Sequence, residues 1–336
     1  MSIRLKPLAE QVVVITGASS GIGLVTAREA ARRGARVVLV ARDEDALATI
    51  VREIAAEGGE AAYAVADVGV PGEVEAAAAR AIERFGRIDT WVNDAGVTLY
   101  ARLLDTPFAD HERLMRTNYF GVVNGCVAAA PHLMKQGGAL ISLGSIVSDI
   151  PAPMQGAYAA TKHAVRGYVN SLRIELLAEG APIAVTLVKP SGIDSPIGEH
   201  ATPDGRPAGR VPPPIYDPAL VAQAILHCAE HPRREITVGG GGRAEVLFGT
   251  HFPALLDRLA PLIIPLMFDP KLRKHGPRNL FAPQGDGHAR SQAMHGRRTS
   301  LYTAAQLHPR TAAVALGGLL AIGGALLLGR RARARA

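Results

Sequence analysis

Short apolar runs rich in β-branched residues alternate with helical stretches along most of the sequence. The first unit is QVVVITG at residues 11–17, a helical pattern that closes at Gly34, and a second run, ARVVLVAR, at 35–42. A long helical stretch is expected over 107–134. Further strand-like runs occur at residues 60–68, 88–96, 138–145 and 183–190. Apolar strands joined by helices are typical of a parallel sheet buried on both faces, so the pattern predicts an α/β fold with a doubly wound parallel sheet.

Changes in composition divide the sequence into four parts. Residues 6–243 hold the alternating pattern and are expected to form one α/β domain. Residues 244–269 are apolar but interrupted by three prolines, and the family resemblance described below implies that they lie near a substrate cleft. Residues 270–310 are rich in Gly, His, Pro and Arg, which predicts a basic flexible linker, while residues 311–329 carry no charge.

The basic charge of the protein is concentrated at its C-terminal end. The formal net charge is +7, but residues from Pro270 onward hold twelve Lys and Arg residues and a single acid, Asp286. The rest of the chain is therefore slightly acidic, which argues against nucleic-acid binding and leaves attraction of the tail to an anionic membrane open. Cys126 and Cys228 lack metal-ligand spacing and are expected to be free thiols in a reducing compartment.

The sequence TGASSGIG, residues 16–23, stands between the first predicted strand and the first predicted helix. Gly17 permits a tight turn, while Gly21 and Gly23 allow the backbone to approach a pyrophosphate and the helix to approach the sheet. Free N–H groups at the helix N-terminus attract phosphate. The predicted cofactor contacts in this turn are Gly17, Ser19, Ser20, Gly21, Ile22 and Gly23. A purely structural loop is the alternative for such a turn taken alone.

Arg42 stands at the end of the second predicted strand, where sites that prefer NAD usually place an acidic residue. A guanidinium suits the 2′-phosphate of NADP, so NADP is favoured over NAD. Asp43 follows directly and weakens this preference, and an ordinary solvated surface arginine is the alternative.

The sequence YAATK places Tyr158 and Lys162 four residues apart within a predicted helix. Both side chains then project from one helix face. The pair is either an ordinary solvated phenol and ammonium, or a proton donor with the charge that tunes it.

Three motifs together, TGASSGIG, NDAG at residues 93–96 and YAATK, resemble the short-chain dehydrogenase/reductase family. The resemblance covers roughly residues 6–240 and implies a Rossmann fold that binds a nicotinamide dinucleotide. It implies a catalytic set consisting of Asn118, Ser145, Tyr158 and Lys162, with Ser145 and Tyr158 also contacting the substrate. The further cofactor contacts that it implies are Asp67, Val68, Asn93, Ala95, Gly96, Tyr158, Lys162, Ile193 and Ser195.

The family chemistry gives these side chains distinct roles. Tyr158 would exchange a proton with the carbonyl or alcohol oxygen, with its pKa lowered by Lys162 and the oxidised nicotinamide. Ser145 would hydrogen-bond the same oxygen, Lys162 would hold the nicotinamide ribose, and Asn118 would hold a water of a proton relay. His163 lies one position round the helix and is expected to be structural or exposed.

The sequence departs from the family pattern at a few positions. Asp94 replaces an asparagine of the usual NNAG motif, so the motif here is NDAG. Ser191 replaces the usual glycine after Pro190, and Ser195 stands where threonine is common. These changes affect fine cofactor geometry rather than the class of reaction.

The uncharged run 311–329 is long enough, at ~1.5 Å per residue, to cross a ~30 Å hydrocarbon core as a helix. Small residues recur in it at four-residue spacing, which suits helix packing in lipid. The alternatives are an apolar helix that docks on another subunit and a helix that lies in the membrane interface. We expect a membrane-associated protein whose catalytic domain lies in the cytoplasm.

The sequence as a whole predicts an NADP-dependent oxidoreductase that transfers hydride between NADP(H) and a carbonyl or alcohol substrate of lipophilic character. The expected partners are this small molecule and a membrane, with no nucleic acid and with a homo-oligomer as a possibility. The alternatives are a non-catalytic nucleotide-binding sensor or scaffold on the same fold, and a structural membrane protein. Retention of the whole catalytic set argues against the sensor.

Overall fold

The computed structural model describes residues 3–198, 201, 207–273, 278–283, 287–291 and 294–314. A sheet of seven parallel strands forms its centre. The strands are β1 (Val12–Thr16), β2 (Arg36–Ala41), β3 (Glu60–Val65), β4 (Thr90–Asn93), β5 (Gly138–Leu143), β6 (Ile183–Pro190) and β10 (Glu235–Val238).

The strand order is β10-β6-β5-β4-β1-β2-β3, so the direction of winding reverses between β1 and β4. In doubly wound sheets, ligands bind in the crevice at the carboxyl ends of the strands that flank this reversal. The predicted fold class, a doubly wound parallel α/β sheet of the Rossmann type, is confirmed. The glycine-rich turn after β1 and the NDAG turn after β4 meet at this crevice.

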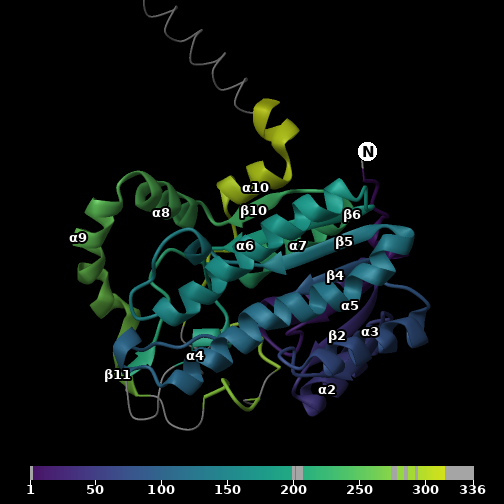
Figure 1. Cartoon of the computed structure of the whole chain (residues 1–336), viewed down its shortest axis with the longest axis horizontal. Coiled ribbons are helices and arrows are strands. Elements are labelled where there is room, and N and C mark those ends of the chain that lie inside the picture. The colour runs from purple at the N-terminus through teal and green to yellow at the C-terminus, as the bar shows by residue number, and fades with distance from the viewer. Residues whose placement is uncertain are drawn as a thin grey trace, which may run out of the picture.

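Helices cover both faces of the sheet (Figure 1). On one face are α1 (Gly21–Arg32), α2 (Glu44–Ala56) and α7 (Pro218–Glu230). On the other face are α3 (Pro71–Phe85), α5 (Gly121–Gln136) and α6 (Gly156–Ala178). Because side chains alternate along a strand, Val13 and Ile15 of β1 enter the first core while Val12 and Val14 enter the second.

The long helical stretch expected over 107–134 is interrupted by a turn of wider helix. It consists of α4 (Phe108–Met115), a π-helical turn at Arg116–Phe120, and α5. Single π-turns inside α-helices frequently occur at functional sites. This one contains Asn118, whose side chain is fully buried.

Beyond β10 the chain forms two helices that stand off the end of the sheet. Figure 1 shows α8 (Gly240–His251) and α9 (Pro253–Ile263) at the edge of the molecule, away from the strands. A short strand, β11 (Phe268–Arg273), then pairs with β8 (Pro207–Gly209). A second small sheet pairs β7 (Gly192–Ile193) with β9 (Ile215–Tyr216).

The described residues of segment 270–310 pack against the α/β domain, which differs from the free linker expected from composition. The short helix α10 (Leu301–Leu307) lies against the domain, and its Leu307 and Thr303 side chains are buried. The N–H of Gly239, directly after β10, donates to Thr303 Oγ1 at 3.0 Å. Scattered backbone and side-chain contacts of this kind leave no periodic sequence signal.

The predicted membrane segment at 311–329 lies outside the described residues from 315 onward. Within the described part of the chain, no helix has both the length and the apolar character needed to cross a bilayer. Cys126 and Cys228 are free and buried, as the sequence predicted.

Candidate active site

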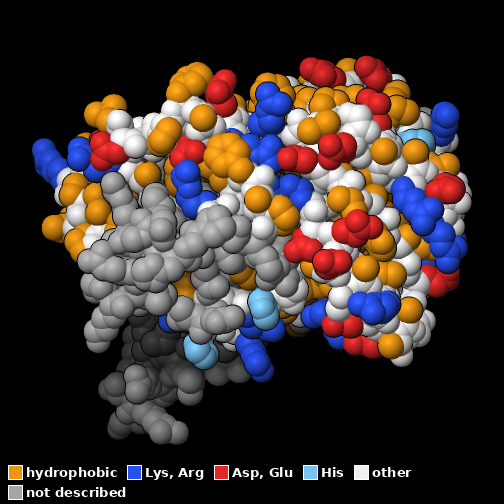
Figure 2. All heavy atoms as spheres, turned by 90° about the horizontal axis from the view of Figure 1, so that it is seen from below, with side chains coloured by type: hydrophobic (Ala, Val, Ile, Leu, Met, Phe, Trp, Pro, Cys, Tyr) orange, Lys and Arg blue, Asp and Glu red, His pale blue; other side chains and the backbone are white. Residues whose placement is uncertain are grey.

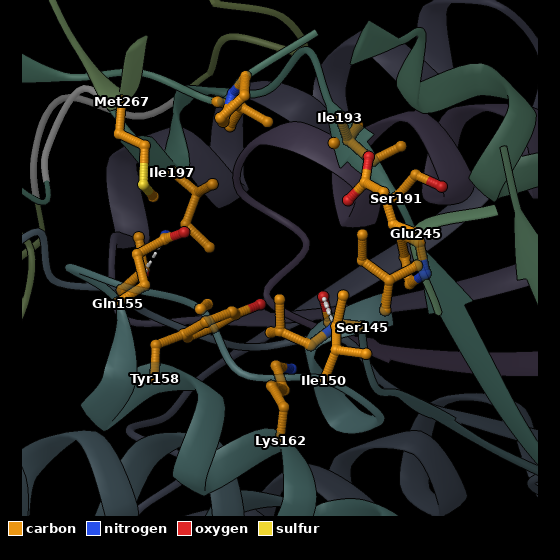
Figure 3. Close-up of a pocket in the computed structure, with 18 of the residues that line it drawn as sticks. Ser145, Ile150, Gln155, Tyr158, Lys162, Ser191, Ile193, Ile197, Glu245 and Met267 are labelled. Carbon is orange, nitrogen blue, oxygen red and sulfur yellow. Dashed lines mark hydrogen bonds between the residues drawn. The ribbon is translucent and has the colours of Figure 1, made fainter. Parts of the chain in front are cut away.

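Tyr158 and Lys162 project from α6 towards one end of a cavity, with Ser145 facing them from the loop after β5 (Figure 3). The Nζ atom of Lys162 lies 5.6 Å from the centre of the Tyr158 ring and donates to the Leu143 carbonyl at 2.8 Å. This buried ammonium is therefore tied to the end of β5 while it stands beside the phenol. The two residues are not a solvated surface pair.

A local capping arrangement fixes the loop that carries Ser145. The Ser145 N–H donates to Ser148 Oγ at 3.1 Å, and the Val147 N–H donates to Ser145 Oγ at 3.3 Å. These bonds form a capping box at the start of the 3₁₀ turn Ile146–Ser148. The Ser145 hydroxyl is held in this way near the Tyr158 phenol, and both residues line the same cavity.

Burial dominates the protonation of this group of residues. It raises the pKa of Tyr158 well above its ordinary value; the Ser145 hydrogen bond opposes this shift and the Asp94 charge adds to it. Burial also lowers the pKa of Lys162 to about 8, against the effect of Asp94. In the protein alone, the expected lowering of the phenol pKa by Lys162 is therefore outweighed by desolvation.

Asp94 is a third ionisable group within this cluster. Burial raises its pKa to about 7, while the Lys162 charge and a hydrogen bond from the Gly23 N–H act in the opposite direction. Its side chain lines both of the cavities that meet at the site. The carboxylate thus links the helix N-terminus of α1 electrostatically to the lysine on α6.

Asn118 braces the site without lining either cavity. Its Oδ1 accepts from the Val97 N–H at 2.8 Å, and its Nδ2 donates to the Val97 carbonyl at 2.9 Å and to Thr161 Oγ1 at 3.0 Å. The π-helical turn is thereby fastened both to the loop after β4 and to α6. Both N–H groups of the side-chain amide are engaged in these contacts, so a water of the predicted relay would bond to the second lone pair of Oδ1 or to the backbone of Asn118.

The larger cavity has a volume of about 460 Å³ and contains the Ser145, Tyr158 and Lys162 side chains. Its remaining wall comes largely from apolar residues of the loop after Ser145, of residues 211–214 and of α8 and α9. The apolar residues on the helical side are Phe248, Leu256, Ala260, Ile263, Leu266 and Met267. Gln155 and Glu245 are among the few polar side chains that reach it (Figure 3).

A second cavity, of about 150 Å³, lies at the crevice between β1 and β4. The predicted cofactor residues that line it are Gly17, Ser19, Ser20, Gly21, Ile22, Arg42, Asp67, Val68, Ala95, Gly96 and Ser195. A Cβ atom on Gly17 would lie 2.7 Å from the Ala95 Cα, and one on Gly23 would lie 2.3 Å from the Gly17 carbonyl oxygen. Only glycine allows this close approach of the turn, the helix and the strand, so the residues fit the phosphates of a dinucleotide.

Arg42 lies on the rim of the second cavity, and its guanidinium is held by backbone oxygens. It donates to the Asn279 carbonyl at 2.6 Å and to the Leu280 carbonyl at 3.4 Å. Asp67, on the same side, forms an ion pair with Arg113 of α4. Arg42 and Asp67, both predicted to contact the adenosine end of the cofactor, are thus held by residues 279–280 and by α4. None of the sequence motifs indicated these two segments.

Five of the predicted cofactor residues do not line the second cavity. Gly23 packs against the Gly17 carbonyl, and Tyr158 and Lys162 line the larger cavity. The Asn93 side chain points into the core, where Oδ1 accepts from Trp91 Nε1 at 2.8 Å and Nδ2 donates to Ser142 Oγ at 3.2 Å. Side chains alternate along β4, which places Asn93 on the buried side facing α5. Ile193 contributes to the larger cavity rather than to the one beside the glycine-rich turn.

Several cavity residues were not predicted from the sequence. Glu245 and Phe248 belong to α8, and Asn279 and Pro283 belong to the segment expected to be a linker. The helical residues belong to the apolar segment 244–269, which was expected near a substrate cleft although these two side chains were not named. Asn279 and Pro283 had no signal in the sequence, because their contribution to the cavity depends on where the backbone lies.

Comparison with known proteins agrees with the fold and the motifs. Residues 11–205 match the short chain dehydrogenase family. The chain is 42% identical over 331 residues to the uncharacterized oxidoreductase YxnA of Bacillus subtilis, covering 95% of this chain and 91% of that protein.

Solved structures show the same similarity. A short chain dehydrogenase/reductase from Burkholderia phymatum in complex with NAD has a TM-score of 0.66 at 26% identity, covering 80% of this chain and 99% of that one. An alcohol dehydrogenase from Thermococcus sibiricus complexed with 5-hydroxy-NADP has a TM-score of 0.60 at 29% identity, covering 68% and 95%. The protein is therefore an oxidoreductase of the short-chain dehydrogenase family, built to bind a nicotinamide dinucleotide.

Proposed function

We propose that this protein interconverts a lipophilic carbonyl compound and the corresponding alcohol, using NADP(H). The observation that carries the proposal is the Tyr158 phenol, which lines the larger cavity together with Ser145 and lies beside the buried Lys162. The residues that line both cavities are Ile22, Asp94, Gly96, Ser195 and Ile197. Oxidation of NADPH in the presence of lipophilic aldehydes and ketones tests the proposal.

The residues of the chain would manage the proton and the developing charge of this reaction. Bound NADPH supplies the hydride that reduces the carbonyl carbon. Tyr158 donates its phenolic proton to the carbonyl oxygen, which yields the alcohol, and in the reverse direction it accepts the alcohol proton. Ser145 donates a hydrogen bond to the same oxygen as negative charge develops on it. Lys162 lies next to the phenol and is the group through which Tyr158 regains a proton after it has donated one.

The electrostatic position of Asp94 leads to a prediction about pH. Alcohol oxidation needs the phenolate form of Tyr158, so its rate should rise as the pH rises through the pKa of that group. The Asp94 charge raises this pKa. Asp94→Asn keeps an acceptor for the Gly23 N–H but removes the charge, so the rising limb of kcat against pH should move to lower pH. An unchanged profile, or a move to higher pH, would show that Asp94 does not tune the phenol.

Arg42 supports NADP as the cofactor in preference to NAD. The guanidinium is a fork of donors that matches a phosphate group, and its place on the rim of the dinucleotide cavity suits the 2′-phosphate. The residue is fixed there by two carbonyl oxygens, so little side-chain freedom remains to be lost on binding.

The substrate cavity supports a lipophilic substrate. Its volume suits a drug-sized or lipid-like molecule, and most of its wall is apolar. The inner side of α9, with Leu256, Ala260 and Ile263, forms part of this wall. Glu245 is the ionisable group on the α8 side, and burial raises its pKa. An apolar molecule with one polar group is the class that such a lining favours.

The opposite side of α9 supports placement of this cavity next to a membrane. A stripe of leucines at helical spacing, Leu255, Leu259 and Leu262, is exposed by 43%, 43% and 71%. Figure 2 shows hydrophobic side chains gathered at the end of the molecule where α9 lies, with basic side chains beside them. Together with the uncharged run 311–329, the stripe favours attachment to a membrane with the catalytic domain in the cytoplasm.

Membrane attachment can be tested by fractionating cells that express the full-length protein. The full-length protein should sediment with membranes and stay there through a high-salt wash, because apolar contacts survive screening of charge. A form ending at Arg310, which keeps α10, should be released more readily. Ending the chain at Pro270 would remove the buried Leu280 and Leu307 and so confuse attachment with folding. Full-length protein in the soluble fraction would contradict attachment.

A further inference from the structure

A segment near the C-terminus contributes to the lining of the dinucleotide cavity. We call it the strap and define it as described residues 278–283 and 287–291. At its start, Arg278 forms an ion pair with Asp110 of α4. At its end, Arg290 forms two hydrogen bonds to Asp217, at 2.9 and 3.0 Å, and the Ser291 N–H donates to Asp194 at 3.1 Å. Both ends are therefore fastened to the α/β domain.

Leu280 anchors the middle of the strap in the protein interior. Its side chain is 1% exposed and packs in a small apolar cluster with Val97, Leu99, Leu114 and Ala157. Its carbonyl oxygen accepts from Arg113 Nε at 2.8 Å as well as from Arg42. Figure 1 shows this part of the chain as a yellow-green coil below the sheet, and the ion pair to Asp110 places it beside α4.

The strap forms hydrogen bonds with residues of the glycine-rich turn and with Arg42, all of which are predicted cofactor contacts. The Gly287 N–H donates to the Ser19 carbonyl at 2.9 Å, and the Gly21 N–H donates to the His288 carbonyl at 3.0 Å. Arg42 donates to the Asn279 carbonyl. Each of these bonds joins a strap residue to a residue that lines the dinucleotide cavity.

The cavity persists beneath the strap. Asn279 and Pro283 line it together with Gly17, Asp67 and Ala95 from the opposite side. The strap thus forms a wall of the cavity and does not fill it. If the strap only blocked an empty site, it would occupy the space of the ligand, and no cavity would remain beneath it.

We propose that the strap is the outer wall of the dinucleotide site, which retains the bound cofactor and holds Arg42 in position to contact it. This proposal rests on the proposed use of a nicotinamide dinucleotide. With the strap docked, the adenosine end of the cofactor is enclosed between the glycine-rich turn and residues 279–283. The cofactor leaves when Leu280 and the arginine contacts release, so strap opening limits the dissociation rate.

Strap variants can be tested in the full-length protein by stopped-flow displacement of NADPH. Leu280→Ala shortens the buried anchor, and Arg290→Gln breaks the ion pair to Asp217 at a distance from the cavity lining. Each should speed NADPH dissociation by about tenfold, since changes in affinity fall mainly on the dissociation rate. The rate of a single turnover of prebound NADPH should change much less than the dissociation rate, because neither residue touches the Tyr158 group. Leu177→Ala, which shortens an exposed side chain on α6, is the matched control.

The outcomes separate the alternatives. Unchanged dissociation in both variants would overturn the proposal, and so would slower dissociation, which would mean that the strap competes with the cofactor. Circular dichroism establishes whether Leu280→Ala is folded, and Arg290→Gln decides the question if it is not. Failure of the unaltered protein to bind either NADPH or NADH would overturn the proposed function itself and, with it, the strap proposal.

Discussion

Tyr158→Phe should lower kcat by ~10²-fold or more, because it removes the only proton that the phenol can transfer while keeping the ring. The ring fills its place on α6 beside Lys162, so the packing and the dinucleotide cavity should be preserved. The dissociation constant for NADPH should stay within about threefold of the original value.

The measurement is steady-state turnover with a saturating carbonyl substrate, together with NADPH binding followed by its fluorescence. Tyr168→Phe is the control, since it removes a phenolic hydroxyl from the same helix at a position that lines neither cavity. Near-normal turnover in the Tyr158 variant would remove this residue from the mechanism.

Arg42→Ala should weaken binding of NADPH by about 10- to 100-fold and binding of NADH by much less. Only NADPH carries the 2′-phosphate, and charge-assisted bonds from a guanidinium to a phosphate are among the strongest single contacts that a side chain makes. Loss of Arg42 also removes its bonds to the strap, which affects both cofactors alike. The ratio of the two dissociation constants is therefore the quantity to measure.

Arg52→Ala provides the comparison for this variant. Arg52 is exposed on α2, and among the described residues its hydrogen bonds go only to neighbours on its own helix, so both dissociation constants should be unchanged. Equal weakening of NADPH and NADH by Arg42→Ala would mean that Arg42 supports the strap but does not choose the cofactor.

The sequence predicted the parts of the structure that depend on local periodicity. Apolar β-branched runs such as 12–16 form buried parallel strands because both of their faces can be covered by helices. The glycine-rich turn was also predictable, since the close contacts at Gly17 and Gly23 exclude every side chain. The helical spacing of Tyr158 and Lys162 placed both on one face of α6.

Features that depend on contacts between distant residues were not predictable in the same way. The π-helical turn around Asn118 reflects bonds to Val97 and Thr161, which no local pattern encodes. The protonation of Tyr158 depends on burial, which a reading of the Tyr–Lys spacing alone underestimates.

The strap shows why composition can mislead. Its bonds to the dinucleotide cavity come from backbone groups of Asn279, Gly287 and His288, so the identity of these side chains gives little indication of them. Leu280 gives it one apolar anchor, and one anchor produces no periodic signal. A segment rich in Gly, Pro and Arg therefore resembles a linker even where it packs against the domain.

A test for transfer of deuterium from labelled NADPH to product addresses the proposed reaction itself. Full-length protein would be incubated with NADPH that carries deuterium at both hydrogen positions of nicotinamide C4, together with hexanal, decanal, hexadecanal or a ketone of matching length in separate reactions. Mass spectrometry of the alcohols should show one deuterium per product molecule with the unaltered protein and a loss of ~10²-fold or more with Tyr158→Phe. Binding of NADPH without deuterium transfer to any of these carbonyl compounds would contradict the proposed reaction and favour a nucleotide-binding sensor on the same fold.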